Sequence, residues 1–425
     1  MRAGARPAAA GLAALVTFGA LVAGSGGCDP KKAAPETPDA ADAGAQLVVD
    51  LPGCHPVIGG GTALAGLTPG PLSVVAANGK ALVVSSSTRA AGVVLGPTGA
   101  AESPAFVIAA APADAGAEAP PTLASALALG SELSTLTYAV RRATAADCAD
   151  AVLATTSTAP GAARRELLPH ACRQASSLRA ATHGKLAIAL ATSPAVAPSV
   201  EAWLLDGTEA KPALLETFGP VTGKEAKDAG PTGPATVESP AVAAGSSSVA
   251  AAYVVHRGSA SELHVARLGG PGGPPARVEV LDKEHIGTVA LAFEDDTLHV
   301  VWSSFVPEKR RFVLRWSKWP AGGAPTAAQS IGTGVLSATK PSLAIDHGRF
   351  LLAWTEGEDR SSTVKVGASR RGIAPISGLA TVVSSAGVIA EAPAVAIDND
   401  ALFVAWLERG AAEPSARAAA LKCRE

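Results

Sequence analysis

Short apolar runs alternate with polar turns along most of the chain, and the pattern recurs about every fifty residues. The two clearest copies are "PSLAIDHGRFLLAW", residues 341–354, and "PAVAIDNDALFVAW", residues 393–406. In each copy a small apolar run leads to a carboxylate and a turn, and a second apolar run ends in tryptophan. The seven copies end their second run at Ser85, Leu136, Leu190, Tyr253, Trp302, Trp354 and Trp406. The last four copies are clearer than the first three.

The local chemistry of each copy predicts a β-hairpin. The turn residues tolerate a positive φ angle, and the flanking runs are rich in Val, Leu and Ile. A helix would need about ten or more residues of helical periodicity, which the repeats do not show. The turns are expected at Asn78–Gly79, His183–Gly184, Ser246–Ser247, Asp295–Asp296, His347–Gly348 and Asn399–Asp400.

Two further strand-like runs follow each hairpin, such as "TVKVGASR" and "LATVVSS" in the sixth unit or "ELHVARL" and "ARVEVL" in the fourth. Four strands in about fifty residues is the period of a propeller blade. In this period and strand count the chain resembles the β-propeller superfamily. It lacks the kelch and WD40 signatures and is only loosely similar to sialidase-type repeats. We therefore expect an all-β fold, a seven-bladed β-propeller of four-stranded antiparallel blades.

The last unit supplies only three strands, the third of which ends at Cys423. The segment "QLVVDLPGCHPVIG", residues 46–59, belongs to no other blade, and as a fourth strand it would remove the open edge of blade 7. This pairing predicts a disulfide between Cys54 and Cys423. A bridge that closes so long a loop stabilises the fold strongly in the chain-entropy model.

The remaining cysteines predict a second disulfide. Four are left once Cys28 is set aside, and an even number in an exported protein indicates two bridges. Cys148 follows the second strand of its blade and Cys172 follows the fourth, and both connections lie at the same end of an antiparallel blade. We therefore expect a Cys148–Cys172 bridge. Zinc is the alternative, but the cysteines include no close pair, so we expect neither a metal site nor a cofactor.

The chain begins with "MRAGARPAAAGLAALVTFGALVAGSGGC". A basic start, an apolar run and small residues before Cys28 follow the plan of a secretory signal peptide. The segment resembles a bacterial lipoprotein signal, which implies that the Cys28 thiol carries a diacylglyceryl group. Ser25 stands where that family usually has leucine. An ordinary cleaved signal with an incidental cysteine, or an uncleaved anchor, are the alternatives.

These features predict three regions. Residues 1–27 form a lipoprotein signal peptide, residues 28–45 the lipidated cysteine with a flexible tether, and residues 46–425 the propeller. The tether is rich in Pro, Ala and acid and has too little apolar surface to offset the entropy of ordering. The expected location is the cell envelope, where the protein is lipid-anchored to a membrane and faces the periplasm or the cell exterior.

The formal net charge is −2, which excludes the strongly basic face of a nucleic-acid binder. No second long apolar run is present after the signal, so we expect nothing else to cross a membrane. The expected partners are a membrane, reached through the lipid anchor, and an envelope protein or glycan. The propeller itself is expected to be monomeric.

Polar stretches that break the repeat suggest a binding rim. "VVHRGS", "LDKEHIG" and "PEKRRF" fall in loops that share one end of the neighbouring blades 4 and 5. A mixed-charge rim of this kind would suit an anionic partner or polysaccharide, although solvated loops are commonly charged. The candidate rim residues are His256, Arg257, His285, Lys309, Arg310 and Arg311.

The repeated aromatic and acidic side chains have structural and functional interpretations. The tryptophans that end the hairpins could stack on sugars, but at the end of a continuous apolar strand we expect them to pack between blades. Trp319, beside Pro320, is expected to be an exposed aromatic. Glu294, Asp346 and Asp398 precede their turns in register, and we expect them to cap those turns rather than to form a ring of ligands.

No catalytic residues can be assigned from the sequence. It contains no G-x-S-x-G, H-E-x-x-H or P-loop motif. A sialidase-like site would need a paired Tyr and Glu, and neither Tyr138 nor Tyr253 has an evident partner. We expect a binding or scaffold module, with a propeller glycan hydrolase or lyase as the alternative.

Overall fold

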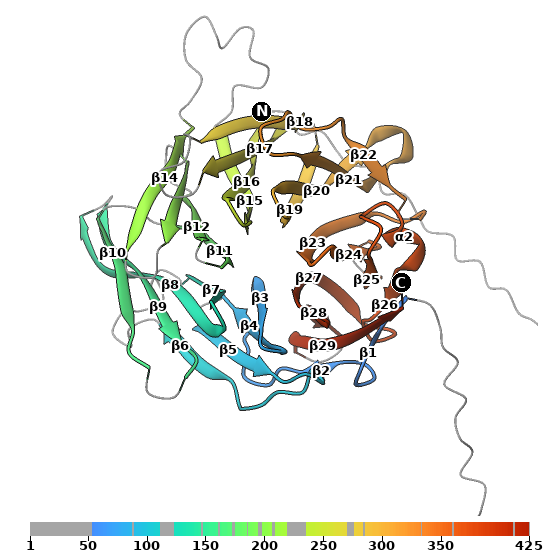
Figure 1. The fold of residues 1–425 in the computed structure, drawn as a ribbon, viewed down its shortest axis with the longest axis horizontal. Coiled ribbons are helices and arrows are strands. Elements are labelled where there is room, and N and C mark those ends of the chain that lie inside the picture. Colours follow the sequence, from blue (N-terminus) through green and yellow to red (C-terminus); the bar gives the residue numbers. More distant parts are fainter. Residues whose placement is uncertain are drawn as a thin grey trace, which may run out of the picture. The chain divides into compact units, whose positions relative to one another are not determined.

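The computed structural model describes residues 53–424 except 87–88, 111–122, 146–147, 160–161, 172–174, 185, 194–197, 206–208, 219–234, 270–275, 284, 333, 359–360 and 411–412. The chain divides into residues 1–50 and 51–425, and the described residues belong to the second unit. The predicted signal, Cys28 and tether lie outside them. The second unit contains seven antiparallel sheets arranged around a central channel (Figure 1). It is the expected all-β, seven-bladed propeller.

The first three blades follow one another along the chain, each beginning with its innermost strand. Blade 1 contains β3 (Leu72–Ala77), β4 (Lys80–Ser85), β5 (Arg89–Leu95) and β6 (Phe106–Ala110). Blade 2 contains β7 (Leu123–Leu129), β8 (Glu132–Ala145), β9 (Cys148–Ser157) and β10 (Arg165–Ala171). Blade 3 contains β11 (Ser177–His183), β12 (Leu186–Ser193), β13 (Ser199–Leu205) and β14 (Ala210–Thr217).

The later blades continue the same order. Blade 4 contains β15 (Ala235–Ala244), β16 (Ser248–Arg257), β17 (Ala260–Gly269) and β18 (Arg277–Lys283). Blade 5 contains β19 (Ile286–Glu294), β20 (Thr297–Val306), β21 (Arg311–Trp319) and β22 (Gln329–Ile331). Blade 6 contains β23 (Ala338–Asp346), β24 (Arg349–Glu356), β25 (Thr363–Ser369) and β26 (Thr381–Val382). Blade 7 contains β27 (Ile389–Asp398), β28 (Ala401–Arg409), β29 (Ser415–Arg424) and, from the start of the described chain, β1 (Gly53–Pro56).

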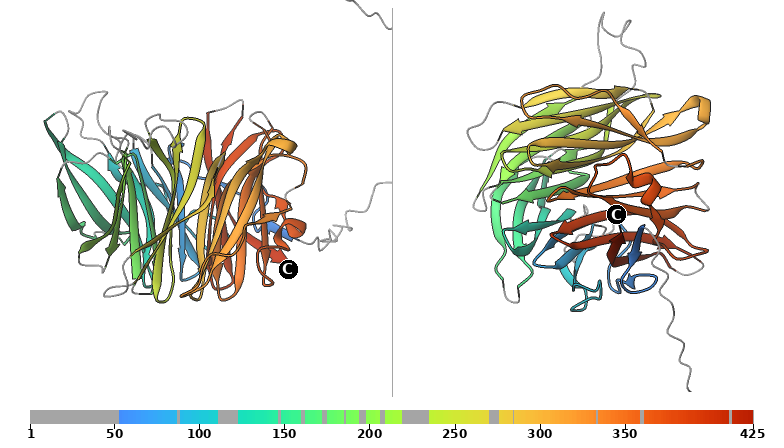
Figure 2. Two further views of the ribbon diagram at one scale, coloured as in Figure 1. Left: turned by 90° about the horizontal axis from the view of Figure 1, so that it is seen from above. Right: turned by 45° about the vertical axis from the view of Figure 1, so that its right-hand side comes forward.

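Blades 1 to 6 have four strands each, and β1 and β2 both run antiparallel to β29, so every innermost strand starts at the same end of the channel. We call this the leading end, and we call the other end, where the innermost strands finish in the first hairpin, the trailing end. Figure 2 shows the blades from the side, with their strands running between the two ends. The turns between second and third strands and the connections between blades therefore lie at the leading end.

The ring closes as predicted through blade 7. Strand β1 pairs antiparallel with β29, and Cys54 lies opposite Cys423, to which it is bonded in a disulfide. The pairing covers an edge of the last sheet that would otherwise be open. The short strand β2 (Thr62–Ala63) also pairs with β29, which the sequence pattern did not indicate.

The first hairpins confirm most of the predicted turn chemistry. Asn78, Asp295, His347 and Asn399 all have positive φ, between 46° and 53°. In the third unit the turn comes one residue later than expected, because His183 pairs with Leu186. Two short helical turns, η2 (Pro307–Lys309) and α2 (Ile376–Leu379), were not predicted.

Counted from these turns, the positions equivalent to Trp406 in the second and third units are Thr137 and Ala191. The expected ends at Leu136 and Leu190 are therefore one residue too early. Both assignments failed because alternating Ala and Leu residues fit the pattern in either register.

Side chains connect the innermost strands of neighbouring blades. Ser73 Oγ accepts a hydrogen bond of 2.8 Å from the backbone N–H of Ala126, and Ser342 Oγ accepts one of 3.1 Å from Val395 N–H. Ser125 Oγ accepts from Ala180 N–H in the same way. These serines lie at the same distance before their hairpin turns, so each joins its blade to the next at one level of the channel.

The core consists of the apolar layers between neighbouring blades. One cluster joins blades 6 and 7 around Trp406 and Val366, and another joins blades 4 and 5 around Trp302 and Val254. Strands such as β24 are buried along their whole length because they are covered on both faces. No helix in the described part of the chain is long and apolar enough to cross a membrane.

Candidate ligand-binding site

The central channel holds a cavity of about 1140 Å³, lined by the innermost strands of all seven blades. This volume slightly exceeds the usual range for small-molecule pockets, roughly 300 to 1,000 Å³. The lining is mainly small and apolar, and its charged groups gather at the two ends. The cavity volume is therefore large enough for a sugar unit or a short polymer segment, and a few polar side chains are available for recognition.

Three charged residues of blades 6 and 7 line the leading end of the channel. Glu391 pairs with Lys340 through one carboxylate oxygen, and its other oxygen lies 2.7 Å from Arg409 Nη2. Burial favours the neutral acid, but the hydrogen bond and charge of Lys340, with the charge of Arg409, hold the pKa of Glu391 below its usual range. One carboxylate is thus shared by two cations, which leaves a net positive charge there.

Arg179 of β11 lines the same half of the channel. It lies at the same distance before its hairpin turn as Ser73, Ser125 and Ser342, so it replaces the connecting serine of blades 1, 2 and 6. Its Nη1 donates a hydrogen bond of 3.3 Å to the carbonyl of Leu178. None of the described carboxylates pairs with it, and burial lowers the pKa of its guanidinium. Arg179 is therefore a cation that breaks the symmetry of the ring.

The trailing end of the channel is acidic, but its carboxylates have structural partners. Asp346 Oδ2 accepts from Asn399 N–H at 2.8 Å, and Asp398 Oδ2 accepts from Gly79 N–H at 2.6 Å. Each aspartate therefore binds the turn of the following blade. Each also contacts its own turn, as predicted: Asp346 Oδ1 lies 3.0 Å from His347 Nδ1, and Asp398 Oδ1 accepts from Asn399 Nδ2 at 3.2 Å. Glu294 lies 3.1 Å from the ring of the buried His299. The two aspartate contacts connect neighbouring hairpins around the ring, whereas the Glu294 contact lies within blade 5.

The predicted rim residues of blade 4 lie at the leading end. His256 Nε2 is 3.8 Å from Glu238 Oε2, and this pair occupies the positions of Arg409 and Glu391 in blade 7. Arg257 has one buried guanidinium nitrogen with no hydrogen-bond partner among the described atoms.

The rim residues of blade 5 also lie at the leading end, and some have structural contacts. The ring of His285 packs edge-on against Phe305, with centroids 5.9 Å apart. Arg311 donates hydrogen bonds to the carbonyls of Gly334 and Leu336, which holds the connection to blade 6. Lys309 and Arg310 form an exposed turn, in which Arg310 has a φ of 52°. Lys309 and Arg310 therefore remain the most accessible rim cations.

The aromatic residues that end the hairpins are buried between blades, as expected. Tyr253, Trp302, Trp354 and Trp406 have at most 1% of their surface exposed. Each lies directly opposite a base on the third strand of its blade, and an acid lies close by. The four opposing bases are His264, Arg315, Lys365 and Arg417.

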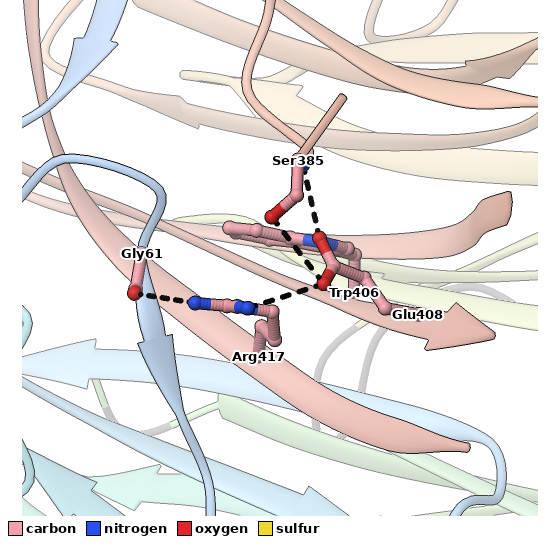
Figure 3. A network of polar contacts seen from close by, with 5 residues as sticks. All are labelled: Gly61, Ser385, Trp406, Glu408 and Arg417. Carbon is pink, nitrogen blue, oxygen red and sulfur yellow. Dashed lines mark hydrogen bonds and ion pairs between the residues drawn. The ribbon is translucent and has the colours of Figure 1, made fainter. Parts of the chain in front are cut away.

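Blade 7 shows the arrangement most fully (Figure 3). Trp406 Nε1 donates to Glu408 Oε1 at 2.9 Å, and Arg417 Nη1 lies 3.3 Å from the other carboxylate oxygen. Ser385 N–H also donates to Glu408, and Arg417 donates to the carbonyl of Gly61 next to β2. Burial favours neutral Glu408, but the bonds from Trp406 and Ser385 and the charge of Arg417 hold its pKa below the usual range.

In blades 4 and 5 the acid comes from the outermost strand of the preceding blade. Tyr253 donates to Glu216 of β14, and Trp302 Nε1 donates to Asp282 of β18 at 2.7 Å. Burial, followed by the hydrogen bond and charge of Glu216, raises the pKa of Tyr253. The sequence did not show that Tyr253 has a glutamate partner, because the two residues belong to different blades. Tyr253 is buried and Glu216 partly buried, and neither belongs to the described lining of the channel.

Two further expectations have definite outcomes. Trp319 is buried, with its Nε1 donating to the carbonyl of Gly323, so the expectation of an exposed aromatic was wrong. The adjacent turn of residues 320–323 folds back over the indole. The Cys148–Cys172 bridge stays a prediction, because Cys172 lies outside the described residues. Within the described ranges no cluster of three or more His, Cys, Asp and Glu is arranged to hold a metal ion.

Comparison with known proteins supports the fold. No family model matches the chain, and no curated protein matches it in sequence. Among solved structures, an ulvan lyase from a new family of polysaccharide lyases aligns with a TM-score of 0.52 and 10% identity over 84% of this chain and 94% of that one.

Two other solved structures align less well. The β-propeller domain of the Trilobed protease from Pyrococcus furiosus has a TM-score of 0.46 and 8% identity over 80% of this chain and 92% of that one. The phage phi92 endosialidase has a TM-score of 0.48 and 10% identity, over 86% and 70% respectively. At sequence identities of 8% to 10%, these alignments show similarity of fold only.

Proposed function

We propose that the protein is a lipid-anchored binding or scaffold module of the cell envelope, whose propeller binds an envelope polymer or partner at the leading end of the channel. The observation that carries this proposal is the uneven distribution of charge in the channel. Among the described residues that line the channel, the leading half holds Arg179, Lys340 and Arg409 against one carboxylate, Glu391. At the trailing end Asp346 and Asp398 bind neighbouring turns.

The predicted rim extends this site outward on blades 4 and 5. Lys309 and Arg310 are exposed at the same end as the channel cations. Exposed charges contribute little to stability, so their contribution would be to attract an anionic ligand and speed its association.

Binding is tested with the full protein purified in detergent and immobilised, then exposed to fractionated envelope polysaccharides and proteins. Saturable capture that weakens with added salt supports the proposal, because charge-dominated recognition is screened by ions. Failure to retain any fraction at low salt would contradict it.

The same assay tests the alternative of a glycan hydrolase or lyase. The fold of an ulvan lyase resembles this propeller, but similarity of fold does not indicate which substrate this protein would act on. Captured polysaccharide should be recovered at its original chain length. Shortened chains or new unsaturated ends would make the protein an enzyme.

Lipid attachment needs a separate experiment. Cells given a labelled fatty acid should transfer the label to the wild-type protein and not to the Cys28→Ala variant. Label retained in the variant would remove the anchor from the proposal without affecting the propeller.

A further inference from the structure

Arg179 differs from the other charged groups of the channel in having so few partners. Lys340 and Arg409 share Glu391, whereas the guanidinium of Arg179 has one hydrogen bond, to the carbonyl of the residue before it. A guanidinium has five N–H donors in a planar fork, and this geometry matches a carboxylate. Most of these donors remain available on the channel side.

The side chains at the level of Arg179 are suited to accept a ligand rather than to neutralise the arginine. Ser73 and Ser342 each accept a backbone N–H, and a hydroxyl that accepts a bond still has its own proton to donate. The other four blades carry Ser125, Ala241, Ala290 and Ala394 at this level. No described side chain at this level is therefore an anion.

Replacement of serine by arginine at this level is not required by the fold. Three blades use a serine here to bind the next innermost strand, and Arg179 cannot accept the equivalent N–H because it has no acceptor atom. Blades 4, 5 and 7 carry alanine here and lack this bond too, so the cost particular to Arg179 is a partly desolvated charge in the channel. Such a cost is typical of a functional position rather than of a structural one.

We propose that Arg179 binds the carboxylate of a uronic-acid unit, so that the channel takes an acidic polysaccharide from its leading end. This inference rests on the proposed binding function and names its ligand class. The serine hydroxyls would bind sugar oxygens at the same level, and Lys340 and Arg409 would attract the neighbouring acidic units. The small apolar lining leaves room for the sugar ring.

The test uses polygalacturonate as the probe and its methyl ester, which has the same backbone without free carboxylates, as the control ligand. The wild-type protein in detergent should bind polygalacturonate and not the ester. Arg179→Ser should weaken this binding by about 10- to 100-fold, the range expected for loss of a hydrogen bond to a charged group. Arg179→Lys should restore part of it, because lysine keeps the charge but not the planar fork.

Arg179→Ser is chosen because it introduces the residue that three other blades already carry, so it should fold normally. A matched control is Arg277→Gln, which removes an exposed arginine from β18 outside the channel. This variant should bind like the wild type.

The outcomes separate the two proposals. If the wild type captures no envelope fraction and no polygalacturonate, the binding function itself fails. If it captures envelope fractions but not polygalacturonate, or if Arg179→Ser binds polygalacturonate as well as the wild type, the assignment of Arg179 to a uronic acid is overturned while the binding function stands. Dextran sulfate is a second probe, which carries sulfates in place of carboxylates. If Arg179→Ser weakened the binding of dextran sulfate and not that of polygalacturonate, Arg179 would bind a sulfate, and the uronic-acid proposal would be overturned.

Discussion

Blades 4 to 7 and blades 1 to 3 share one backbone arrangement, but they differ in the type of side chain at one buried position of the second strand, the position of Trp406 in blade 7. In blades 4 to 7 this position on the second strand holds Tyr253, Trp302, Trp354 and Trp406, each opposite a basic residue. In blades 1 to 3 the equivalent residues are Ser85, Thr137 and Ala191, which lie opposite Ala91, Ala154 and Glu201. All seven are buried.

The difference shows that the propeller does not depend on the aromatic residues. Turn chemistry and apolar strands are enough to form blades 1 to 3, whose core contains other large side chains such as Tyr138 and Trp203. The aromatic, basic and acidic groups of the later blades add specific polar contacts, and in blades 4 and 5 these contacts reach the preceding blade. They make the repeat visible in the sequence, and we expect them to make the later blades the more stable half.

The largest effect is expected in blade 7, at the disulfide that holds the closing strand β1 to β29. Cys54→Ala removes the disulfide to Cys423, which joins residues 369 positions apart. Loss of a constraint on so long a loop should lower the free energy of unfolding by about 6 kcal/mol in the chain-entropy model. Urea unfolding of the variant measures the loss, and a change below about 1 kcal/mol would show that the pairing of β1 with β29 closes the ring without the bridge.

The next largest effect is expected at Trp406, and it is compared with the effect at the equivalent residue of blade 2, Thr137. Trp406→Ala should cost about 3 to 5 kcal/mol, because it leaves a large cavity between blades. Thr137→Ala, at the same position of blade 2, should cost only about 1 kcal/mol, since it removes one hydroxyl bond to the carbonyl of Ala154. Both are measured by urea unfolding. Equal losses would contradict the view that the aromatic position distinguishes the two halves.

A smaller effect is expected when only the indole hydrogen bond of Trp406 is removed and most of its packing is kept. Trp406→Phe removes the indole N–H that binds Glu408 and should cost about 1 to 2 kcal/mol beyond the change in volume. Trp354→Phe is the matched control, because its indole N–H is buried with no hydrogen-bond partner among the described atoms. The two variants should therefore differ in thermal stability by about that amount. Equal destabilisation would assign the role of these tryptophans to packing alone.

The smallest effect concerns pH. The pKa of Glu408 lies below its usual range, so this carboxylate contributes stability above the pKa of the unfolded chain, about 4.3, and the contribution is lost as pH falls through the lower pKa of the fold. Glu408→Gln should be less stable than the wild type at neutral pH and should lose less stability on acidification. Parallel urea midpoints for the two proteins from about pH 6 to pH 3 would rule this contribution out.

Much of the fold could be predicted because its information is local. Pairs such as Asn399–Asp400 mark the hairpins, and the apolar runs around them mark the paired strands. Even the closure of the ring was predictable, since the segment around Cys54 had no place in any other blade. Strand β2 escaped prediction because two residues carry no periodicity.

The candidate site was less predictable because it depends on contacts between blades. Arg179, Lys340 and Glu391 come from three blades separated by about fifty or more residues each, and none belongs to a motif. A signal for Arg179 does exist, since it is the one charged residue at its level once the innermost strands are aligned from their turns. The one-residue error in the third unit hid that signal.

The position of the disulfide also decides how the ring would respond to mechanical load. Strand β1 begins at the trailing end, and Cys54 is its second residue. Any force applied to the chain ahead of Gly53 therefore reaches a covalent bond to β29 almost at once, before it can peel β1 away by breaking its hydrogen bonds one at a time. The ring stays closed under tension, and the force acts at the end of the propeller opposite the cationic opening of the channel.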